Sequence, residues 1–187
     1  MRHVSIKLLK SKKAVIVAAI VAAVMMVAIV AVRLLIFDLL VINGHSMSPT
    51  IRHGDRVLVN RLAYRYDKPE RGDIVAFKVD SGRIFVKRVV GLPGDIIEVR
   101  QGVLYRNGKK VVNEPYVRFR PRSLRRRSYK PGTLQNGLLF VMGDNRASSV
   151  DSKDFGPIPY RNVIGKAILI YFPPRRMKQL RRISGET

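Results

Sequence analysis

The sequence predicts a mainly β protein, in which one N-terminal transmembrane helix precedes a domain built on antiparallel β-sheet. Two observations lead to this fold class. Ala14 to Val32 is an uncharged apolar run, and after residue 42 short runs rich in Val, Ile, Leu and Phe alternate with turn signals. Many short strands separated by close turns are typical of antiparallel β architectures, so we expect a partly closed barrel or a sandwich.

The apolar run is expected to anchor the chain in a membrane. As a helix it would rise about 28 Å, which matches the hydrocarbon core of a bilayer. Residues 1–13 are basic and contain no acid, and a basic flank before the first helix favours an N-terminus inside and the rest outside. One alternative is a cleaved secretory signal, whose apolar region normally spans about 7–15 residues. A buried helix of a soluble protein is another.

These features predict four segments and a location. The chain should begin with a basic cytoplasmic N-terminus (1–13) and a transmembrane anchor (14–33). A β-rich extracytoplasmic domain (34–174) and a basic C-terminal tail (175–187) should follow. We therefore expect a single-pass protein of the plasma membrane.

Composition excludes some kinds of site. The 187 residues include no cysteine, so disulfides, thiolate metal sites and cysteine nucleophiles are ruled out. The formal net charge is +23, from 36 Lys and Arg against 13 Asp and Glu. This charge predicts attraction to polyanions, but it does not distinguish nucleic acid from anionic lipid or wall polymer.

The β-rich domain is expected to contain a hairpin and several longer strands. Asn107-Gly108 is a strong two-residue hairpin signal between 103–106 and 109–112. Two basic stretches, 118–130 and the tail after Pro173, are expected to be a solvated loop and a frayed end, or else contacts for anionic headgroups or wall polymer. The expected longer strands are Arg56–Asn60, Asp73–Val79, Arg83–Val90, Asp95–Arg100, Leu138–Met142 and Asn162–Phe172.

The stretch GHSMSPTI contains a possible nucleophile, Ser46, among small and turn-forming residues. A serine nucleophile needs a base, and two histidines are near in sequence. His45 is adjacent, but successive side chains of an extended segment face opposite sides. His53 could fold back across a turn and act as the base with a carboxylate partner, either Asp55 or Asp73.

The third candidate base is Lys87, in the stretch RIFVKRVVGLPGD. Alternation along a strand places it on the same face as Phe85 and Val89, whereas Arg88 points the opposite way. Burial lowers the pKa of a lysine, and a shift from about 10.4 towards 7–8 takes on the order of 4 kcal/mol. A neutral amine is a competent base for a serine hydroxyl. An exposed strand lysine is the plain alternative, so the residues alone leave the base undecided.

Four stretches occur in one order after the apolar run: SMSPTI, RGDIVAFK, KRVVGLPGD and GDNRASSVDSKDFG. The last two, in this order and at this spacing, are very specific. Together the four stretches resemble the bacterial type I signal peptidase family in its short single-anchor form. The resemblance covers nearly the whole chain, from the basic N-terminus to about Phe172.

The resemblance implies a membrane-bound serine endopeptidase with a serine–lysine dyad. Such an enzyme removes signal peptides from secreted preproteins after small–any–small motifs at the outer membrane surface. It needs no metal or other cofactor. The implied partners are preprotein signal peptides and the lipid bilayer, in proximity to the secretion translocon, with no specific nucleic acid.

The resemblance also assigns residues by position. Ser46 matches the nucleophile, Lys87 the general base and Ser149 the residue that orients the lysine amine. Asp151 and Lys153 match an ion pair that holds the loop, although most members have arginine where Lys153 stands. Structural support is expected from Asp144, Asn145 and Arg146.

Two further assignments concern the substrate. Some members supply an oxyanion-hole serine two residues before the nucleophile, where this chain has Gly44, as Gram-positive members commonly do. The remaining donors would then be the backbone N–H of Ser46 and either a water molecule or a nearby backbone amide. The substrate pocket is expected to be lined by Leu40, Ile42 and Val86 with Met47 nearby, although these residues could equally be ordinary core.

Two other functions compete with this one. A membrane-tethered polyanion-binding module would account for the charge, but not for the combination of Ser46, Lys87 and the GDNR stretch. A self-cleaving regulator resembling the phage and SOS repressors would share the serine–lysine chemistry. Such regulators carry a DNA-binding domain and a scissile linker, whereas this chain has an apolar anchor in their place.

Overall fold

The structure, a computed structural model, describes residues 2–79, 82–117 and 128–185. The chain divides into two compact units, Met1–Phe37 and Asp38–Thr187, and each is described by itself.

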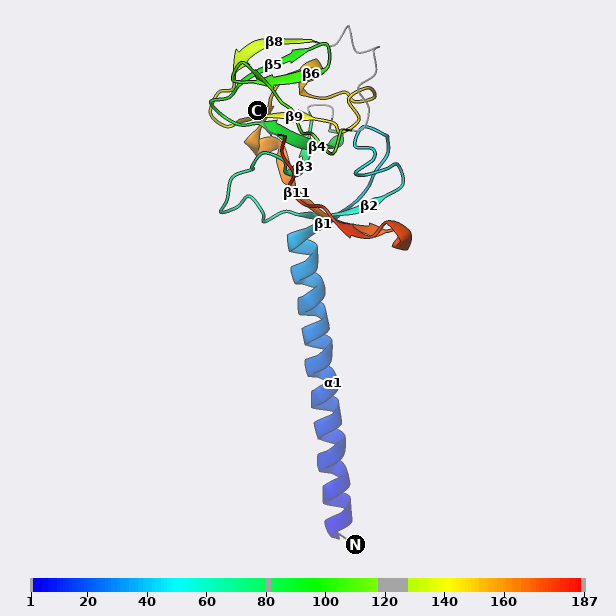
Figure 1. Ribbon diagram of the computed structural model, residues 1–187. Coiled ribbons are helices and arrows are strands. Elements are labelled where there is room, and N and C mark those ends of the chain that lie inside the picture. The colour runs from blue at the N-terminus through cyan, green and yellow to red at the C-terminus, as the bar shows by residue number, and fades with distance from the viewer. Residues whose placement is uncertain (1, 80–81, 118–127, 186–187) are drawn as a thin grey trace. The chain divides into compact units, whose positions relative to one another are not determined.

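The first unit is one long helix, α1 (Arg2–Ile36), which contains no Pro or Gly to interrupt it (Figure 1). Its segment Lys12–Arg33 has a mean hydropathy of 3.2 and is long and apolar enough to cross a membrane. Large apolar side chains along this segment are exposed, for example Val27 at 69%. An apolar surface of this length is unfavourable in water and suits lipid.

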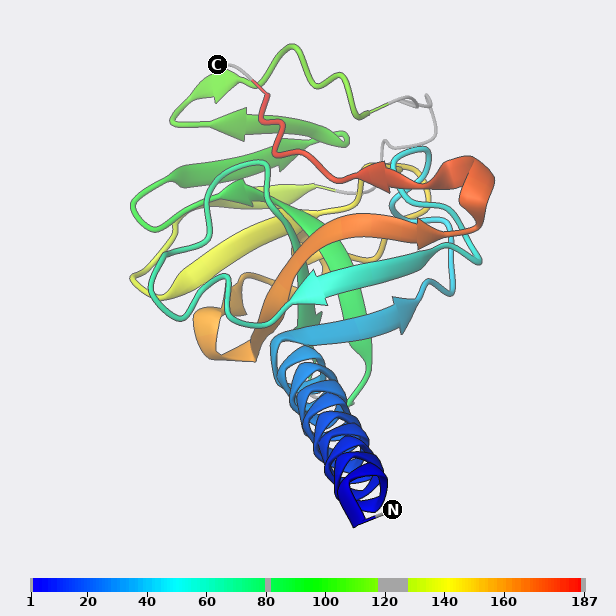
Figure 2. The ribbon, with the colours of Figure 1, turned by 90° about the horizontal axis from the view of Figure 1, so that it is seen from below.

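The second unit is built on two sheets, and the fold-class prediction of a mainly β protein is confirmed. Among the described residues, the larger sheet has eight strands in the order β1-β2-β11-β3-β4-β9-β10, and β12 pairs with β11. Figure 2 shows this sheet curling: β2 (cyan) and β11 (orange) run side by side, and β4 (green) crosses behind them. Its strands are β1 (Phe37–Val41), β2 (Arg56–Asn60), β3 (Ile74–Lys78), β4 (Ile84–Gly91), β9 (Leu138–Met142), β10 (Ile158–Pro159), β11 (Val163–Phe172) and β12 (Lys178–Gln179).

The smaller sheet contains the predicted hairpin. Its order is β7-β6-β5-β8 among the described residues, and β6 pairs with β7 in antiparallel register. Asn107 and Gly108 both have positive φ, 53° and 79°, as a type I′ turn requires. The strands are β5 (Ile96–Arg100), β6 (Val103–Arg106), β7 (Lys109–Lys110) and β8 (Tyr129–Thr133).

Both faces of β3 and β4 are covered, which explains their nearly continuous apolar sequences. On β3, Ile74 and Ala76 pack into one cluster with Val86 of β4. Val75 and Phe77 face a second cluster with Val89. These two strands therefore form the rigid centre of the larger sheet, and Lys87 lies within it, paired in register with Val75.

Several elements were not expected from the sequence. β1 follows α1 directly, and no turn signal separates them in the sequence, so the start of a strand could not be recognised. The short helix α2 (Ser152–Phe155) lies in the GDNR stretch. The 3-10 helices are η2 (Tyr160–Asn162) and η3 (Pro174–Arg176).

The expected frayed end was wrong for the described part of the tail. β12 pairs with β11, Leu180 is buried in the core, and Arg176 forms an ion pair with Asp55. An apolar side chain and a carboxylate partner thus fix a segment that its charge alone suggested was solvated. Of the predicted basic loop 118–130, residues 118–127 lie outside the described residues, and Tyr129 and Lys130 belong to β8.

Candidate active site

The candidate site lies where β4 meets the loop that carries Ser46. Lys87 is only 4% exposed, and its ammonium nitrogen lies 5.2 Å from the centre of the Phe85 ring. Burial lowers the pKa of Lys87 to about 8, although Asp151 opposes this shift. The amine is therefore neutral in a useful fraction of molecules near neutral pH.

Ser46 and Lys87 are in direct contact. Lys87 Nζ donates a hydrogen bond to Ser46 Oγ at 2.6 Å. Two neighbours hold the serine loop in place: Met47 is buried in the core, and the backbone N–H of Asn145 donates to the Ser46 carbonyl at 2.9 Å. The Asn145 side chain also donates to the His45 carbonyl at 3.1 Å. The fold thus fixes the hydroxyl against the amine from both sides of the loop.

The histidine alternative finds no support in the arrangement. Within the described parts of the chain, neither His45 nor His53 forms a hydrogen bond with Ser46. His53 Nδ1 instead accepts from the Gly44 N–H at 3.2 Å. Its two possible carboxylate partners are otherwise engaged, Asp55 with Arg176 and Asp73 with Lys166.

The GDNR stretch folds around a capping box. Asp151 caps α2, and its carboxylate accepts from the Lys153 N–H, while Asp154 accepts from the Asp151 N–H. Asp151 also accepts from the Gly143 N–H at 3.1 Å. This capping box joins the start of the stretch to its end.

Lys153 is buried in the same loop and contacts three acceptors. Its ammonium lies 2.9 Å from Asp151 and 3.3 Å from Asp154, and it donates to the Ser149 carbonyl at 2.7 Å. A lysine cannot offer the planar fork of an arginine. Here three separate acceptors use the three donors of the ammonium group, so the loop is held without bidentate geometry.

Ser149 is fully buried and lies against Gly143. A Cβ added at residue 143 would lie 2.3 Å from Ser149 Oγ and 2.5 Å from the Ser46 carbonyl oxygen. Any side chain at residue 143 would therefore push apart the two segments that meet there. The glycine allows the Ser149 hydroxyl to approach the back of the Ser46 loop.

Two buried arginines hold the residues on either side of Asn145. Arg88 forms a bidentate pair with Asp144, with nitrogen–oxygen distances of 2.9 and 2.7 Å. Arg146 pairs with Glu114 and donates to the Gly143 carbonyl at 3.1 Å. Asp144 and Arg146 are thus each held by a partner from another part of the chain. Asn145, which lies between them, is thereby positioned to donate to the Ser46 carbonyl.

Sequence reasoning missed Arg88, Glu114 and Tyr116 as parts of this network. Arg88 lies 4.2 Å from the centre of the Tyr116 ring, and Tyr116 donates to Glu114 at 3.1 Å. One signal was available, because an arginine on the inner face of an apolar strand needs a buried carboxylate. Its partner could not be deduced, since the pair spans more than fifty residues of sequence.

A pocket of about 500 Å³ opens beside the serine and the lysine. All four predicted pocket residues line it, and Met47 and Val86 also belong to the core cluster. Leu40 and Ile42 pack against the same cluster, so all four side chains contribute both to the pocket wall and to the core, and their contact with substrate stays a prediction. The walls come from β1, β4 and the serine loop, and from Ser148 and Val150. Over the described ranges, no group of three or more His, Cys, Asp or Glu residues could hold a metal ion.

A serine hydroxyl that is hydrogen-bonded to a buried amine beside a partly apolar pocket is an arrangement suited to a serine hydrolase. A protein-family model described as "Signal peptidase, peptidase S26" matches residues 13–172. The chain belongs to this family and is a serine peptidase.

Individual relatives agree with the family match. Signal peptidase I of Bacillus caldolyticus is 39% identical over 155 residues, covering 78% of this chain and 85% of the relative. A probable signal peptidase I-1 of Synechocystis is 38% identical over 144 residues, or 72% and 71% of the two chains. Signal peptidase IB of Staphylococcus aureus is 36% identical over 146 residues, or 71% and 76%.

Proposed function

We propose that this serine peptidase removes signal peptides from preproteins, with Ser46 as nucleophile and Lys87 as general base. The observation that carries the proposal is the 2.6 Å hydrogen bond between Lys87 Nζ and Ser46 Oγ, made by an amine whose pKa burial lowers to about 8. Family membership supplies the substrate class, because the relatives are named signal peptidases.

The reaction begins with proton transfer from the serine hydroxyl. Neutral Lys87 accepts the proton as Ser46 Oγ attacks the scissile carbonyl carbon, and the resulting ammonium then protonates the leaving amine. An ester between Ser46 and the signal peptide remains. Lys87, neutral again, deprotonates a water molecule that cleaves this ester and regenerates the hydroxyl. Every proton that moves in this cycle passes through one amine.

The backbone N–H of Ser46 is the proposed donor to the oxyanion. Gly44 has φ of 136°, which L side chains rarely adopt, although a Cβ there would meet no atom within 4 Å. A serine at residue 44 would thus be strained in this loop. The loop conformation accounts for the glycine and leaves the backbone as the source of the hydrogen bond.

The substrate is proposed to bind as an extended strand. β1 lies at the edge of the larger sheet and contributes Leu40 and Val41 to the pocket. A peptide that pairs with an edge strand points alternate side chains to the same side. Small side chains at positions −1 and −3 would then enter the pocket, and the side chain at −2 would not.

The predicted topology remains part of the proposal. Residues 1–13 would lie in the cytoplasm, 14–33 would span the plasma membrane, and the peptidase domain (34–174) and tail (175–187) would lie outside, near the translocon. Anchoring would raise the effective concentration of membrane-bound substrates at the site. Among the described helices, α1 supports this topology by its length and composition.

Cleavage of a purified preprotein by the full chain tests the dyad. We expect Ser46→Ala and Lys87→Met to abolish cleavage while both variants remain folded by circular dichroism. His53→Gln is the matched control and should keep the activity. Retained cleavage in either dyad variant would refute the assignment. A chelator is expected to leave the wild-type rate unchanged.

A further inference from the structure

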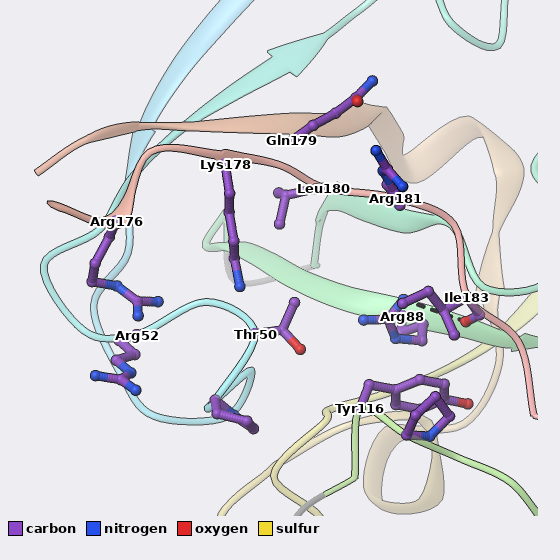
Figure 3. A pocket seen from close by; sticks show the side chains of 12 residues that line it. Thr50, Arg52, Arg88, Tyr116, Arg176, Lys178, Gln179, Leu180, Arg181 and Ile183 are labelled. Carbon is purple, nitrogen blue, oxygen red and sulfur yellow. Dashed lines mark hydrogen bonds between the residues drawn. The ribbon is translucent and has the colours of Figure 1, made fainter. Parts of the chain in front are cut away.

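A second pocket, of about 470 Å³, shares no lining residue with the pocket beside Ser46 and Lys87. Its walls come from the segment 49–52, from Pro115 and Tyr116, and from the tail between Arg176 and Ile183. Arg88 contributes from β4, where it follows Lys87 and points to the opposite face. In Figure 3 the side chains of Lys178, Leu180 and Thr50 point into the space between the tail and the segment 49–52, whereas Gln179 and Arg181 extend to the other side of the tail.

The lining of this pocket is strongly cationic. None of its twelve lining residues is Asp or Glu. Five of them are basic: Arg52, Arg88, Arg176, Lys178 and Arg181. A concave site with charges of one sign concentrates counter-ions more than a flat surface does. The pocket is therefore predisposed to an anionic ligand.

Two of these cations are neutralised within the fold and three are not. Arg88 is paired with Asp144, and Arg176 with Asp55. By contrast, Arg52, Lys178 and Arg181 have no carboxylate within ion-pairing distance among the described residues. Their charges are thus available to a ligand.

Of the three unpaired cations, Lys178 has the least favourable electrostatic surroundings. Burial lowers its pKa, and the neighbouring Arg176 lowers it further. In Figure 3 its side chain extends from the tail into the cavity toward Thr50. An anion placed between them would relieve this repulsion and would also meet a hydroxyl donor.

We propose that this pocket binds a phosphate group, either as a small phosphate ester or as the headgroup of a phospholipid. Lys178, Arg52 and the Thr50 hydroxyl are the direct contacts, and Arg88 and Arg176, each held by its carboxylate partner, form part of the wall around them. A phosphate suits the site because its several oxygens can accept hydrogen bonds from donors on different sides of a cavity. The volume is that of a site for a small molecule.

The test compares two pairs of charge removals in the full chain in detergent. Lys178→Gln with Arg52→Gln removes the unpaired cations of the pocket. Lys109→Gln with Lys110→Gln removes the same charge from the exposed strand β7. Isothermal titration measures the affinity for inorganic phosphate and for glycerol phosphate, after circular dichroism has shown that both variants fold.

We expect the pocket variant to lose affinity for both probes by roughly 30-fold, at about fivefold for each charge removed. The β7 variant should bind as the wild type does. Equal affinity in the two variants, or no binding by the wild type, would overturn the proposal. If the double variant does not fold, Lys178→Gln alone should weaken binding about fivefold.

Vesicles distinguish the two sources of phosphate. The melting temperature is measured in phosphatidylcholine with and without phosphatidylglycerol. If the ligand is a lipid headgroup, the anionic lipid stabilises the wild type and the β7 variant more than the pocket variant. If it is a free phosphate ester, the three proteins respond equally to the lipid and differ only toward the soluble probes.

Discussion

The pH dependence of cleavage follows directly from the environment of Lys87. Burial lowers the pKa of its amine from 10.5 to about 8, which corresponds to about 3 kcal/mol against the charged form. If the neutral amine is the base, as proposed, kcat/KM should rise with pH and level off above about 8. Between pH 6 and pH 8 the neutral fraction, and with it the rate, increases roughly 50-fold.

The assay is the initial rate of preprotein cleavage by the full chain in detergent, with kcat/KM measured at half-unit steps from pH 6 to pH 10. At pH 7 about a tenth of the amine is neutral, whereas an unshifted lysine would be neutral in only about one molecule in 3,000. His53→Gln serves as the control, since its profile should superimpose on that of the wild type.

Two results would refute this reasoning. If kcat/KM rose with an apparent pKa near 10, the amine would be hydrated during catalysis and its burial would not lower its pKa. A limb near 6.5 that disappears in His53→Gln would assign the base to the histidine.

Three further predictions concern stability. Lys87→Met should stabilise the protein at pH 7 by about 1–3 kcal/mol in denaturant unfolding. The pKa of Lys87 in the folded state is lowered from 10.5 to about 8, so the wild type loses stability as the pH falls from 10.5 to below 8. A gain in the variant that persisted above pH 10.5 would contradict this. Gly143→Ala should lower both the melting temperature and the cleavage rate, since its Cβ would lie 2.3 Å from Ser149 Oγ, and wild-type values would disprove the contact. Arg88→Met should cost about 3–5 kcal/mol by leaving Asp144 buried and unpaired, with partial recovery on adding Asp144→Leu; no recovery would argue against the pair.

Local patterns predicted the strands and the hairpin well. β2 and β9 begin and end at the predicted residues, because polar and turn-forming residues flank their apolar runs. β1 was missed because it continues the apolar sequence of α1 without a break. Alternation correctly placed Lys87 and Arg88 on opposite faces of one strand.

Long-range pairing was beyond the sequence. The carboxylate partners of Arg88 and Arg146 lie 56 and 32 residues away, and neither local period nor composition specifies such distances. The tail was misjudged for the same reason, since Asp55 lies 121 residues from Arg176. The contact between Ser46 and Lys87 also spans 41 residues, and only the family resemblance singled it out.

Because Lys87 and Arg88 are adjacent on β4, the proposed activity depends on the correct register of β4 against β3. If β4 slid by one residue against β3 in the direction that brings Arg88 opposite Val75, a guanidinium would occupy the place of the amine and Asp144 would lose its counter-ion. A guanidinium does not release its proton in proteins, so a misaligned molecule would have no base for Ser46. Proteolytic competence would thus appear only in correctly assembled molecules, and a chain still folding could not cut its neighbours.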